Sequence, residues 1–373
     1  MKPNFDFYCE KVRKGENIRK AFLELVKAGL FPVNNSRFTV NGFIDWESVY
    51  LLAEQQGVVG LVAAGIEWLK VHNSGFTVPQ TVALTFAGAT IQIEQRNKAM
   101  NQFIAELEEK MRAADIYTLL VKGQGVAQCY ERPLWRPSGD VDFLLSEDNY
   151  KKARAYLLPL SSGNKNEERY SQHLGMSIEQ WYVEIHGTLR TGLATRVDRQ
   201  VDAVQKDVFY GGNVRSWLNG GTQVFLPAPD EDVFLVFTHF IKHFYKEGVS
   251  LRQLCDWCRL LWTYRSELDV ALQEQWLRQA GLVEEWQVFS VLAVEYLGMP
   301  VAAMPMYNHS DSCDLRKKAE KLVEFILGGY SGNKIKDTWQ IAKVFPWKAL
   351  HYSPSIFLNV NWLKVKEWLF NSK

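Results

Sequence analysis

The chain has 373 residues, 47% of them hydrophobic, which favours two or three globular domains that each bury a core. Lys and Arg number 43 and Asp and Glu 42, so a net charge of +1 argues against a global basic field for long nucleic acids. Five cysteines, an odd number in a long chain, argue against a disulfide scaffold.

Two further classes are disfavoured by the distribution of charge. Charged residues interrupt segment 1–17, which therefore lacks the apolar core of a secretory signal. The uncharged run 71–93 contains His72, Asn73 and Pro79 and is too polar for a membrane span. We expect a soluble, cytoplasmic protein without a membrane partner.

The first hundred residues have helical periodicity. Asp45 precedes an apolar pattern of helical spacing and is expected to cap that helix. Pro79 suits the first turn of a long helix that ends near Asp115. We expect a helical N-terminal region over residues 1–104.

Strand and helix patterns alternate over residues 105–226. Residues 116–121 (IYTLLV) end at a Lys-Gly step, as expected for a strand that runs into a turn. Further strand candidates are 140–145 (DVDFLL) and 180–189 (QWYVEIHGTL), with a helix expected over 147–160. This mixture predicts an α/β core.

Beyond this core, apolar residues return to helical spacing. Asp230 is expected to cap the first helix, and Ser250 with Gln253 matches a capping box for the next. The predicted fold class is therefore α+β, with a mixed sheet core between helical regions at 1–104 and 227–373.

Two aspartates, Asp140 and Asp142, stand at the start of the second strand candidate. Because side chains alternate along a strand, both carboxylates project to one face, roughly 7 Å apart. A divalent cation between them would remove their repulsion, and carboxylate oxygens are ligands that Mg²⁺ takes. The alternative is an exposed strand edge or turn, where a Gly-Asp step is ordinary.

A third acid lies in the next strand candidate, where Tyr182, Glu184 and His186 share one face. A Glu inside an apolar strand is either an edge residue or a ligand, and a neighbouring strand would place it beside the aspartates. His186 could orient an acceptor or Glu184, or it could be a buried structural histidine.

The turn after the first strand candidate has the outline of a phosphate site. Lys122, Gly123 and Gly125 stand where a helix begins, and free backbone N–H groups at a helix N-terminus attract anions. The alternative is a Gly-rich turn with a solvated lysine.

A zinc site is a rival interpretation elsewhere in the chain. His239 and His243 lie one helical turn apart, and Cys255 and Cys258 form a CxxC pair. The order and spacing of these residues do not match a zinc knuckle, and both pairs fall within aromatic helical patterns. Packing is the preferred interpretation.

Several blocks, in this order, resemble the uncharacterised nucleotidyltransferase family of the DNA polymerase β-like superfamily. The resemblance extends from Leu119 to about Trp257. It is carried by LLVKGQGVAQCYERPLWRPSGDVDFLL, VEIHGTL, PAPDEDVFLVFTHFIKHF and LRQLCDW. It implies a nucleotidyltransferase-like sheet, with two Mg²⁺ ions, or Mn²⁺, held by the catalytic acids Asp140, Asp142 and Glu184.

The resemblance also assigns the turn and the segment after it. Gly123 would take the first position of the family's glycine motif, and Gln124 stands where Ser or Gly is usual. We expect Gly123, Gln124 and Lys122 to contact the nucleotide phosphates. Arg132 and Arg136 in the following segment could reach phosphate oxygens, and Arg136 is the preferred candidate.

Family members carry similar residues at His239, His243, Arg252 and Asp256. These four are expected to line the cleft or to lock the C-terminal helices onto the core, and His186 is a further acceptor candidate. Arg252 and Asp256, at i and i+4, could also be a simple surface pair.

The resemblance thus implies a Mg²⁺-dependent transfer of NMP from an NTP to a hydroxyl or phosphate of an acceptor. Near-neutral charge favours a small-molecule or protein acceptor over a long nucleic acid. Two alternatives remain, namely a catalytically degenerate NTP-binding regulatory module, suggested by Gln124, and a non-enzymatic interaction protein built from the helical regions.

Overall fold

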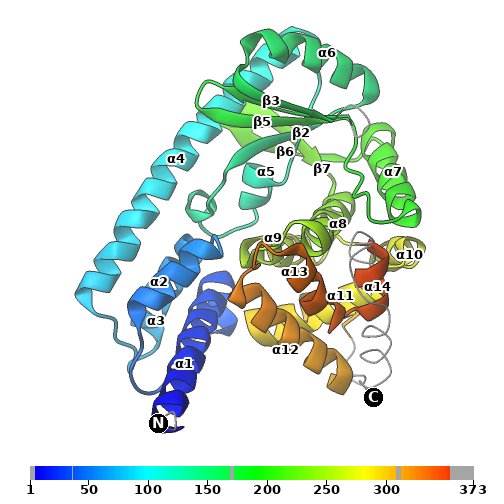
Figure 1. Ribbon diagram of the computed structural model, residues 1–373. Helices are drawn as coiled ribbons and strands as arrows, with labels where there is room; N and C mark the ends of the chain where they lie inside the picture. The colour runs from blue at the N-terminus through cyan, green and yellow to red at the C-terminus, as the bar shows by residue number, and fades with distance from the viewer. Residues whose placement is uncertain (1–4, 36, 169–171, 308–311, 353–373) are drawn as a thin grey trace.

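The computed structural model describes residues 5–35, 37–168, 172–307 and 312–352. Figure 1 shows a sheet at one end of the molecule and two groups of helices at the other. The long helix α4 (Gln80–Ala113) extends from the N-terminal group of helices to the sheet. This helix therefore connects the two ends of the structure.

The N-terminal group consists of α1 (Phe5–Leu30), α2 (Trp46–Gln55) and α3 (Val59–His72). The predicted cap of α2 is confirmed, because the carboxylate of Asp45 accepts the backbone N–H of Ser48. Pro79 precedes α4 as predicted, and α4 continues through the boundary expected near residue 104.

A five-stranded mixed sheet follows, with the strand order β1-β2-β5-β4-β3. Strands β2 and β5 pair in parallel, and the other neighbours pair antiparallel. The bounds are β1 (Leu119–Val121), β2 (Asp140–Leu144), β3 (Ser162–Glu168), β4 (His173–Ile178) and β5 (Trp181–His186). Helix α5 (Gly123–Ala127) follows β1, and α6 (Glu147–Leu157) follows β2. Strands β1, β2 and β5 and helix α6 match predicted elements, whereas β3 and β4 were not predicted.

The sheet has one apolar and one polar face. Val141 and Phe143 on β2, with Val183 and Ile185 on β5, are buried in a core that also contains residues of α4 and α6. Because the strand period is two residues, the side chains between these positions project to the opposite face. The polar residues of β2 and β5 are therefore held in place by a packed apolar layer behind them.

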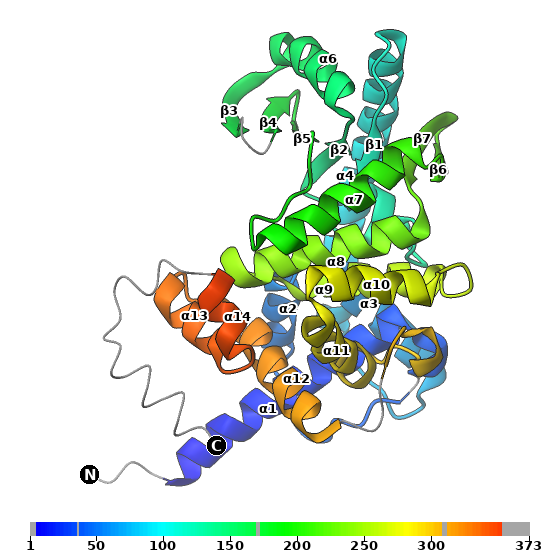
Figure 2. The same cartoon turned by 90° about the vertical axis from the view of Figure 1, so that its right-hand side faces the viewer.

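The remaining elements are mainly helical. They are α7 (Thr195–Tyr210), the hairpin β6 (Val214–Asn219) and β7 (Thr222–Pro227), α8 (Pro229–Lys246), α9 (Leu251–Thr263), α10 (Val270–Ala280), α11 (Val283–Val291), α12 (Ser312–Gly328), α13 (Lys334–Ala342) and α14 (Pro346–Tyr352). A π-helical turn continues α11, and short 3-10 turns join several elements. Figure 2 shows α7 and α8 between the sheet and the other C-terminal helices.

Two predicted helix starts in this region have different outcomes. Ser250 and Gln253 form the predicted capping box of α9. Asp230 does not cap α8, because Ala228 is the N-cap and Pro229 is the first helical residue. Proline suits this first position because it lacks the N–H that would be unsatisfied there. Asp230 lies instead within the first turn.

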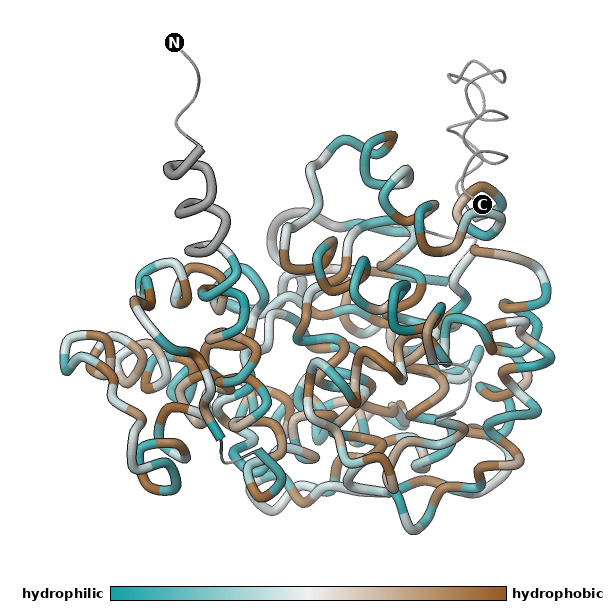
Figure 3. The backbone as a smooth tube through the Cα atoms, turned by 90° about the horizontal axis from the view of Figure 1, so that it is seen from below, coloured by the Kyte–Doolittle hydropathy of each residue, from teal (hydrophilic) through white to brown (hydrophobic). Residues whose placement is uncertain are grey.

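One apolar core connects the N-terminal and C-terminal helices. Phe22 of α1, Val62 of α3, Phe237 of α8 and Trp286 of α11 all belong to it. Figure 3 shows the corresponding alternation of hydrophobic and hydrophilic stretches along the helices. The α+β class, with a mixed sheet flanked by N-terminal and C-terminal helical regions, is confirmed, whereas the division at 104 and 226 stays a prediction. No helix in the described ranges has the length and apolar composition to cross a membrane.

Candidate active site

Three acidic side chains share the polar face of the sheet. Asp140 and Asp142 lie on β2, and Glu184 lies on the parallel neighbour β5. Asp142 pairs with Glu184 in the strand register, whereas Asp140 pairs with Tyr182. Neighbouring strands lie about 4.8 Å apart, so the carboxylates form one cluster. The structure thus brings together the three acids that the sequence singled out.

Neighbouring groups compensate part of the negative charge of this acid cluster. Lys122 Nζ and His186 Nε2 each lie 2.8 Å from Oδ1 of Asp142. Burial opposes ionisation, but Lys122 and the hydrogen bond from His186 hold the pKa of Asp142 below its ordinary value. Burial and the charge of Asp142 instead raise the pKa of Asp140. A further cation would therefore stabilise the ionised form of Asp140.

Two histidines hold Glu184 from an antiparallel pair of strands. His186 lies on β5, and His173 lies directly opposite it on β4. Their Nε2 atoms lie 3.4 and 3.2 Å, respectively, from Oε2 of Glu184, and the two rings stack with centroids 4.8 Å apart. Although burial opposes ionisation, the hydrogen bonds from His173 and His186 lower the pKa of Glu184.

A cavity of about 1060 Å³ opens onto the acid cluster. The polar face of the sheet lines one side, and α8, α9 and the loop before α7 contribute the rest of the wall. The residues predicted from the sequence that line it are Lys122, Gly123, Arg136, Asp140, Asp142, Glu184, His186, His239, His243, Arg252 and Asp256. The fold therefore gathers residues from the core and from the C-terminal helices around one space.

The turn from β1 into α5 aims Lys122 at the acid cluster. Lys122 has a φ of 58° and Gly123 a φ of 39°, and a positive φ is uncommon for a residue other than glycine. Strained backbone of this kind tends to cluster at functional sites. Burial would lower the pKa of Lys122, but the neighbouring Asp142 raises it, so the ammonium stays charged.

The side chain of Gln124, a predicted phosphate ligand, does not line the cavity. Its side chain is buried, and its Nε2 donates to Oδ1 of Asn97 on α4 at 2.8 Å. On α5, the side chain at position 124 points towards α4 and away from the cavity. The side chain of Gln124 thus fastens α5 to the long helix, rather than lying where a phosphate would bind.

Arg136 forms a buried ion pair with Asp256 of α9. Its Nε and Nη2 donate to the two carboxylate oxygens at 2.8 and 2.6 Å, and its Nη1 donates to Ser138 Oγ at 2.9 Å. The hydroxyl of Tyr130 also donates to Asp256, at 2.7 Å. Both side chains of the ion pair are more than nine-tenths buried. Asp256 therefore locks α9 onto the segment before β2, which is one of the two roles expected for it.

The other arginines of this region have different partners. The alternative of a simple surface pair between Arg252 and Asp256 is not formed, because both carboxylate oxygens of Asp256 accept from Arg136. Arg252 lines the cavity and donates Nη1 to the carbonyl oxygen of Pro137 at 2.9 Å. Arg132 lies 2.5 Å from a Glu67 carboxylate oxygen, outside the cavity lining, so it does not reach the predicted phosphate site.

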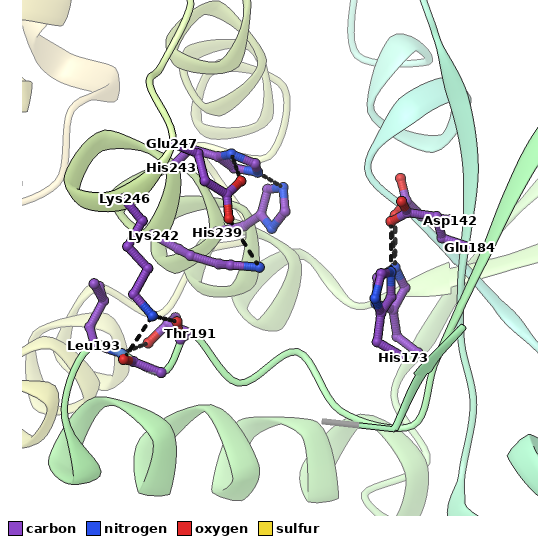
Figure 4. A network of polar contacts seen from close by, with 12 residues as sticks. Asp142, His173, Glu184, Thr191, Leu193, His239, Lys242, His243, Lys246 and Glu247 are labelled. Carbon is purple, nitrogen blue, oxygen red and sulfur yellow. Dashed lines mark hydrogen bonds and ion pairs between the residues drawn. The ribbon is translucent and has the colours of Figure 1, made fainter. Parts of the chain in front are cut away.

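A chain of three side chains, two on α8 and one on the residue that ends it, lies across the cavity from the acids. Figure 4 shows Glu247, His243 and His239 on one side and Asp142 and Glu184 on the other. His243 Nδ1 lies 2.8 Å from Oε2 of Glu247, and the two histidine Nε2 atoms lie 2.9 Å apart. The three residues are four positions apart, so His239 and His243 share one face of α8 and the C-cap residue Glu247 follows at the end of that face.

We refer to Glu247, His243 and His239 as the relay. Its electrostatics favour a neutral His239. Burial, with the positive charge of Lys122, holds the pKa of His239 well below its ordinary value. The hydrogen bond from His243 lowers the pKa of Glu247 to about 2, so this carboxylate is ionised at neutral pH. The relay therefore presents a neutral imidazole to the cavity with a carboxylate behind it.

The rival zinc site is not assembled. Cys255 and Cys258 are buried in the core on α9, and burial raises the pKa of both thiols. His239 and His243 line the cavity instead. Over the described ranges, no group of three potential metal ligands includes either cysteine.

Among the residues that sequence reasoning missed are two that contact predicted site residues, His173 and Glu247. Residues 173–178 (HLGMSI) alternate polar with apolar side chains, a strand signal that would have led to His173. Glu247 follows His243 at i+4, a spacing that places both on one helix face. In both cases the sequence contained a local pattern. Its link to the site became visible only from the residues that the fold places next to it.

A solved structure of an antigenic nucleotidyltransferase-like protein from Paracoccidioides brasiliensis is similar at 11% identity, covering 57% of this chain and 95% of that chain, with a TM-score of 0.35. None of the curated proteins matches the chain. The family described as "Uncharacterised nucleotidyltransferase" matches residues 43–298, a range that contains the whole cavity lining. On the strength of this match over more than half its length, the chain belongs to that family of nucleotidyltransferases.

Proposed function

We propose that the chain is a metal-dependent nucleotidyltransferase that moves a nucleoside monophosphate from an NTP to an acceptor hydroxyl. The acceptor is a small molecule or a protein side chain. The observation that carries this proposal is the convergence of Asp140, Asp142 and Glu184 on one sheet face that lines a large cavity. Family membership supports the reaction class.

The residues present fit divalent cations. Oxygen ligands from neighbouring strands suit Mg²⁺, which commonly binds through a few carboxylates and substrate phosphates. Asp140, with its raised pKa, is a carboxylate that a cation would stabilise, and Asp142 already attracts Lys122. Asp140, Asp142 and Glu184 are the ligands that we propose. When bound, such ions would stabilise negative charge on the triphosphate and on leaving pyrophosphate.

The side chains around the acids are suited to hold the triphosphate. The ammonium of Lys122 and the guanidinium of Arg252 both line the cavity near the acids. Gly123 leaves its backbone open to close approach because it has no Cβ, and its φ of 39° is a conformation that other residues rarely adopt. Arg136 also lines the cavity, where its main role is to hold the wall through Asp256.

The relay on α8 favours a hydroxyl acceptor over a phosphate, because a hydroxyl has a proton to lose. The acceptor oxygen forms a bond to the α-phosphorus, the bond from that phosphorus to the bridging oxygen breaks, and pyrophosphate leaves. Nε2 of His239 faces His243, which leaves Nδ1 of His239 to take the acceptor proton. Glu247 then stabilises the resulting positive charge on the histidine pair.

The first test is nucleotide binding in the absence of any acceptor. We expect α,β-methylene analogues of the NTPs, titrated by calorimetry, to bind in the presence of Mg²⁺ and to lose most of their affinity when EDTA is added. Binding that is the same with and without metal would contradict the proposal. Metal-dependent binding without pyrophosphate release from any NTP, over a panel of polyol and protein acceptors, would instead indicate the degenerate regulatory module.

The relay makes a separate prediction. His239→Asn should lower the rate of pyrophosphate release about 100-fold or more, since general base catalysis contributes about 10²–10⁴. Nucleotide affinity should change little, because His239 is across the cavity from the acids. Glu247→Gln should show a smaller loss and a shifted pH-rate profile. An unchanged rate in His239→Asn would remove His239 from the mechanism.

A further inference from the structure

We propose that His173, Glu184 and His186 form a metal position with nitrogen ligands, which selects Mn²⁺, Co²⁺ or Zn²⁺ over Mg²⁺. It lies beside the carboxylate position of Asp140 and Asp142. Its role in nucleotide transfer rests on the proposed function, with which it shares Glu184. The metal binding itself is a property of the chain alone and can be measured without a nucleotide.

The geometry of the three ligand atoms carries the proposal. One ring nitrogen each of His173 and His186 and a carboxylate oxygen of Glu184 all lie within 4.8 Å of one another. The two histidine nitrogens lie 3.2 and 3.4 Å from Oε2 of Glu184. Ligands bound to one ion at about 2.0–2.2 Å lie about 3.0–3.4 Å from each other, so these two separations already match a coordination shell.

A further carboxylate lies next to one of these ligands. Oδ1 of Asp142 lies 2.8 Å from Nε2 of His186, on the side of the cluster that faces Lys122. Asp142 and Glu184 are neighbours in the strand register. Either carboxylate is therefore near both proposed metal positions, the one at His173 and His186 and the one at Asp140 and Asp142. Two metal positions that share carboxylates are the arrangement expected for a two-metal transferase.

The strands hold these ligands in fixed positions. His173 and His186 are directly opposite on the antiparallel strands β4 and β5, and their rings stack at an interplanar angle of 21°. The side chains of His173, Glu184 and His186 are 20%, 21% and 10% exposed, and all three line the cavity. The position is therefore preorganised and reachable from solvent.

The chemistry of the ligands decides which ion is preferred. Mg²⁺ takes oxygen ligands and gives up water reluctantly, whereas imidazole suits Zn²⁺ and other first-row transition ions. In a site with two imidazoles, affinity should follow the general order in which Mn²⁺ binds more weakly than Co²⁺. Among the described residues, no other group of three potential ligands is as close together.

The test is a titration of the metal-free protein with Co²⁺, followed by visible absorption, and with Mg²⁺, followed by calorimetry. Wild type should bind Co²⁺ at least 10-fold more tightly than Mg²⁺. His173→Ala should weaken Co²⁺ binding at least 10-fold and leave Mg²⁺ affinity within about twofold, because the loss of even a supporting partner costs about 10–100-fold. His173→Gln, which retains a side chain of similar length, should show the same loss and controls for misfolding.

His243→Asn is the matched control, since it removes an imidazole from the same cavity but outside this group. Its Co²⁺ affinity should equal that of wild type. The proposal is overturned if His173→Ala binds Co²⁺ as wild type does, or if wild type does not prefer Co²⁺ over Mg²⁺. Failure of the proposed function has a different signature, namely loss of Mg²⁺-dependent nucleotide binding with Co²⁺ binding to His173 intact.

Discussion

Asp142→Asn is expected to raise the dissociation constant for a Mg²⁺-dependent nucleotide analogue by at least about 100-fold, because removal of even an indirect metal partner costs about 10–100-fold. It should also lower the rate of pyrophosphate release by at least about 1,000-fold, since metal ions contribute several kcal/mol of charge stabilisation. The physical reason is the central position of Asp142 between Lys122, His186 and Glu184. Calorimetric titration and a pyrophosphate assay measure the two effects.

The control for this prediction is Asp202→Asn. Asp202 also lines the cavity, but it pairs with Arg190 in a partly exposed position on α7. The substitution should therefore leave metal-dependent nucleotide binding unchanged. A circular dichroism melt of both variants checks that Asp142→Asn folds, since Lys122 and His186 lose a charged partner. Equal nucleotide binding by Asp142→Asn and wild type would refute the catalytic assignment.

Asp256→Ala is expected to lower the free energy of unfolding by about 3–5 kcal/mol, because it leaves the buried guanidinium of Arg136 without its partner. It also removes the acceptor of the Tyr130 hydroxyl. The double variant Arg136→Met/Asp256→Leu should recover most of this loss, since replacing a buried ion pair by apolar residues is often close to neutral. Urea unfolding followed by tryptophan fluorescence gives both values.

Two comparisons sharpen this result. Glu274→Ala removes the partner of Arg278 from an exposed i,i+4 pair and should cost less than about 1 kcal/mol. A similar small cost for Asp256→Ala would show that the buried pair does not hold α9 to the sheet. The double variant also separates two roles of Arg136, because retained nucleotide affinity assigns it to structure, whereas a large loss assigns it to phosphate binding.

Residue-by-residue patterns predicted the parts of this site that depend on one strand or one helix. The alternation of apolar and polar residues placed Asp140 with Asp142, and Glu184 with His186, on single strand faces. The spacing of His239 and His243 placed both on one face of a helix. These predictions hold because local side-chain direction follows from the strand and helix periods alone.

Contacts between distant segments were outside the reach of such patterns. His173 acquires its neighbours only when β4 and β5 pair, and that strand register depends on which faces become buried. Gln124 stands in the glycine motif by position, but the packing of α5 against α4 directs its side chain to Asn97. The sequence suggests that Arg136 is a phosphate ligand, but in the folded chain α9 places Asp256 beside it as an ion-pair partner.

By itself, the sequence determined the α+β class, the common strand face of Asp140 and Asp142, and the helical placement of His239 and His243. The tertiary structure alone decided that His173 lies beside Glu184 and that the side chain of Gln124 turns to Asn97 instead of the cavity. The physical reason is that periodicity directs a side chain relative to its own backbone. Distances between segments are set by burial of the apolar core, to which residues throughout the chain contribute at once.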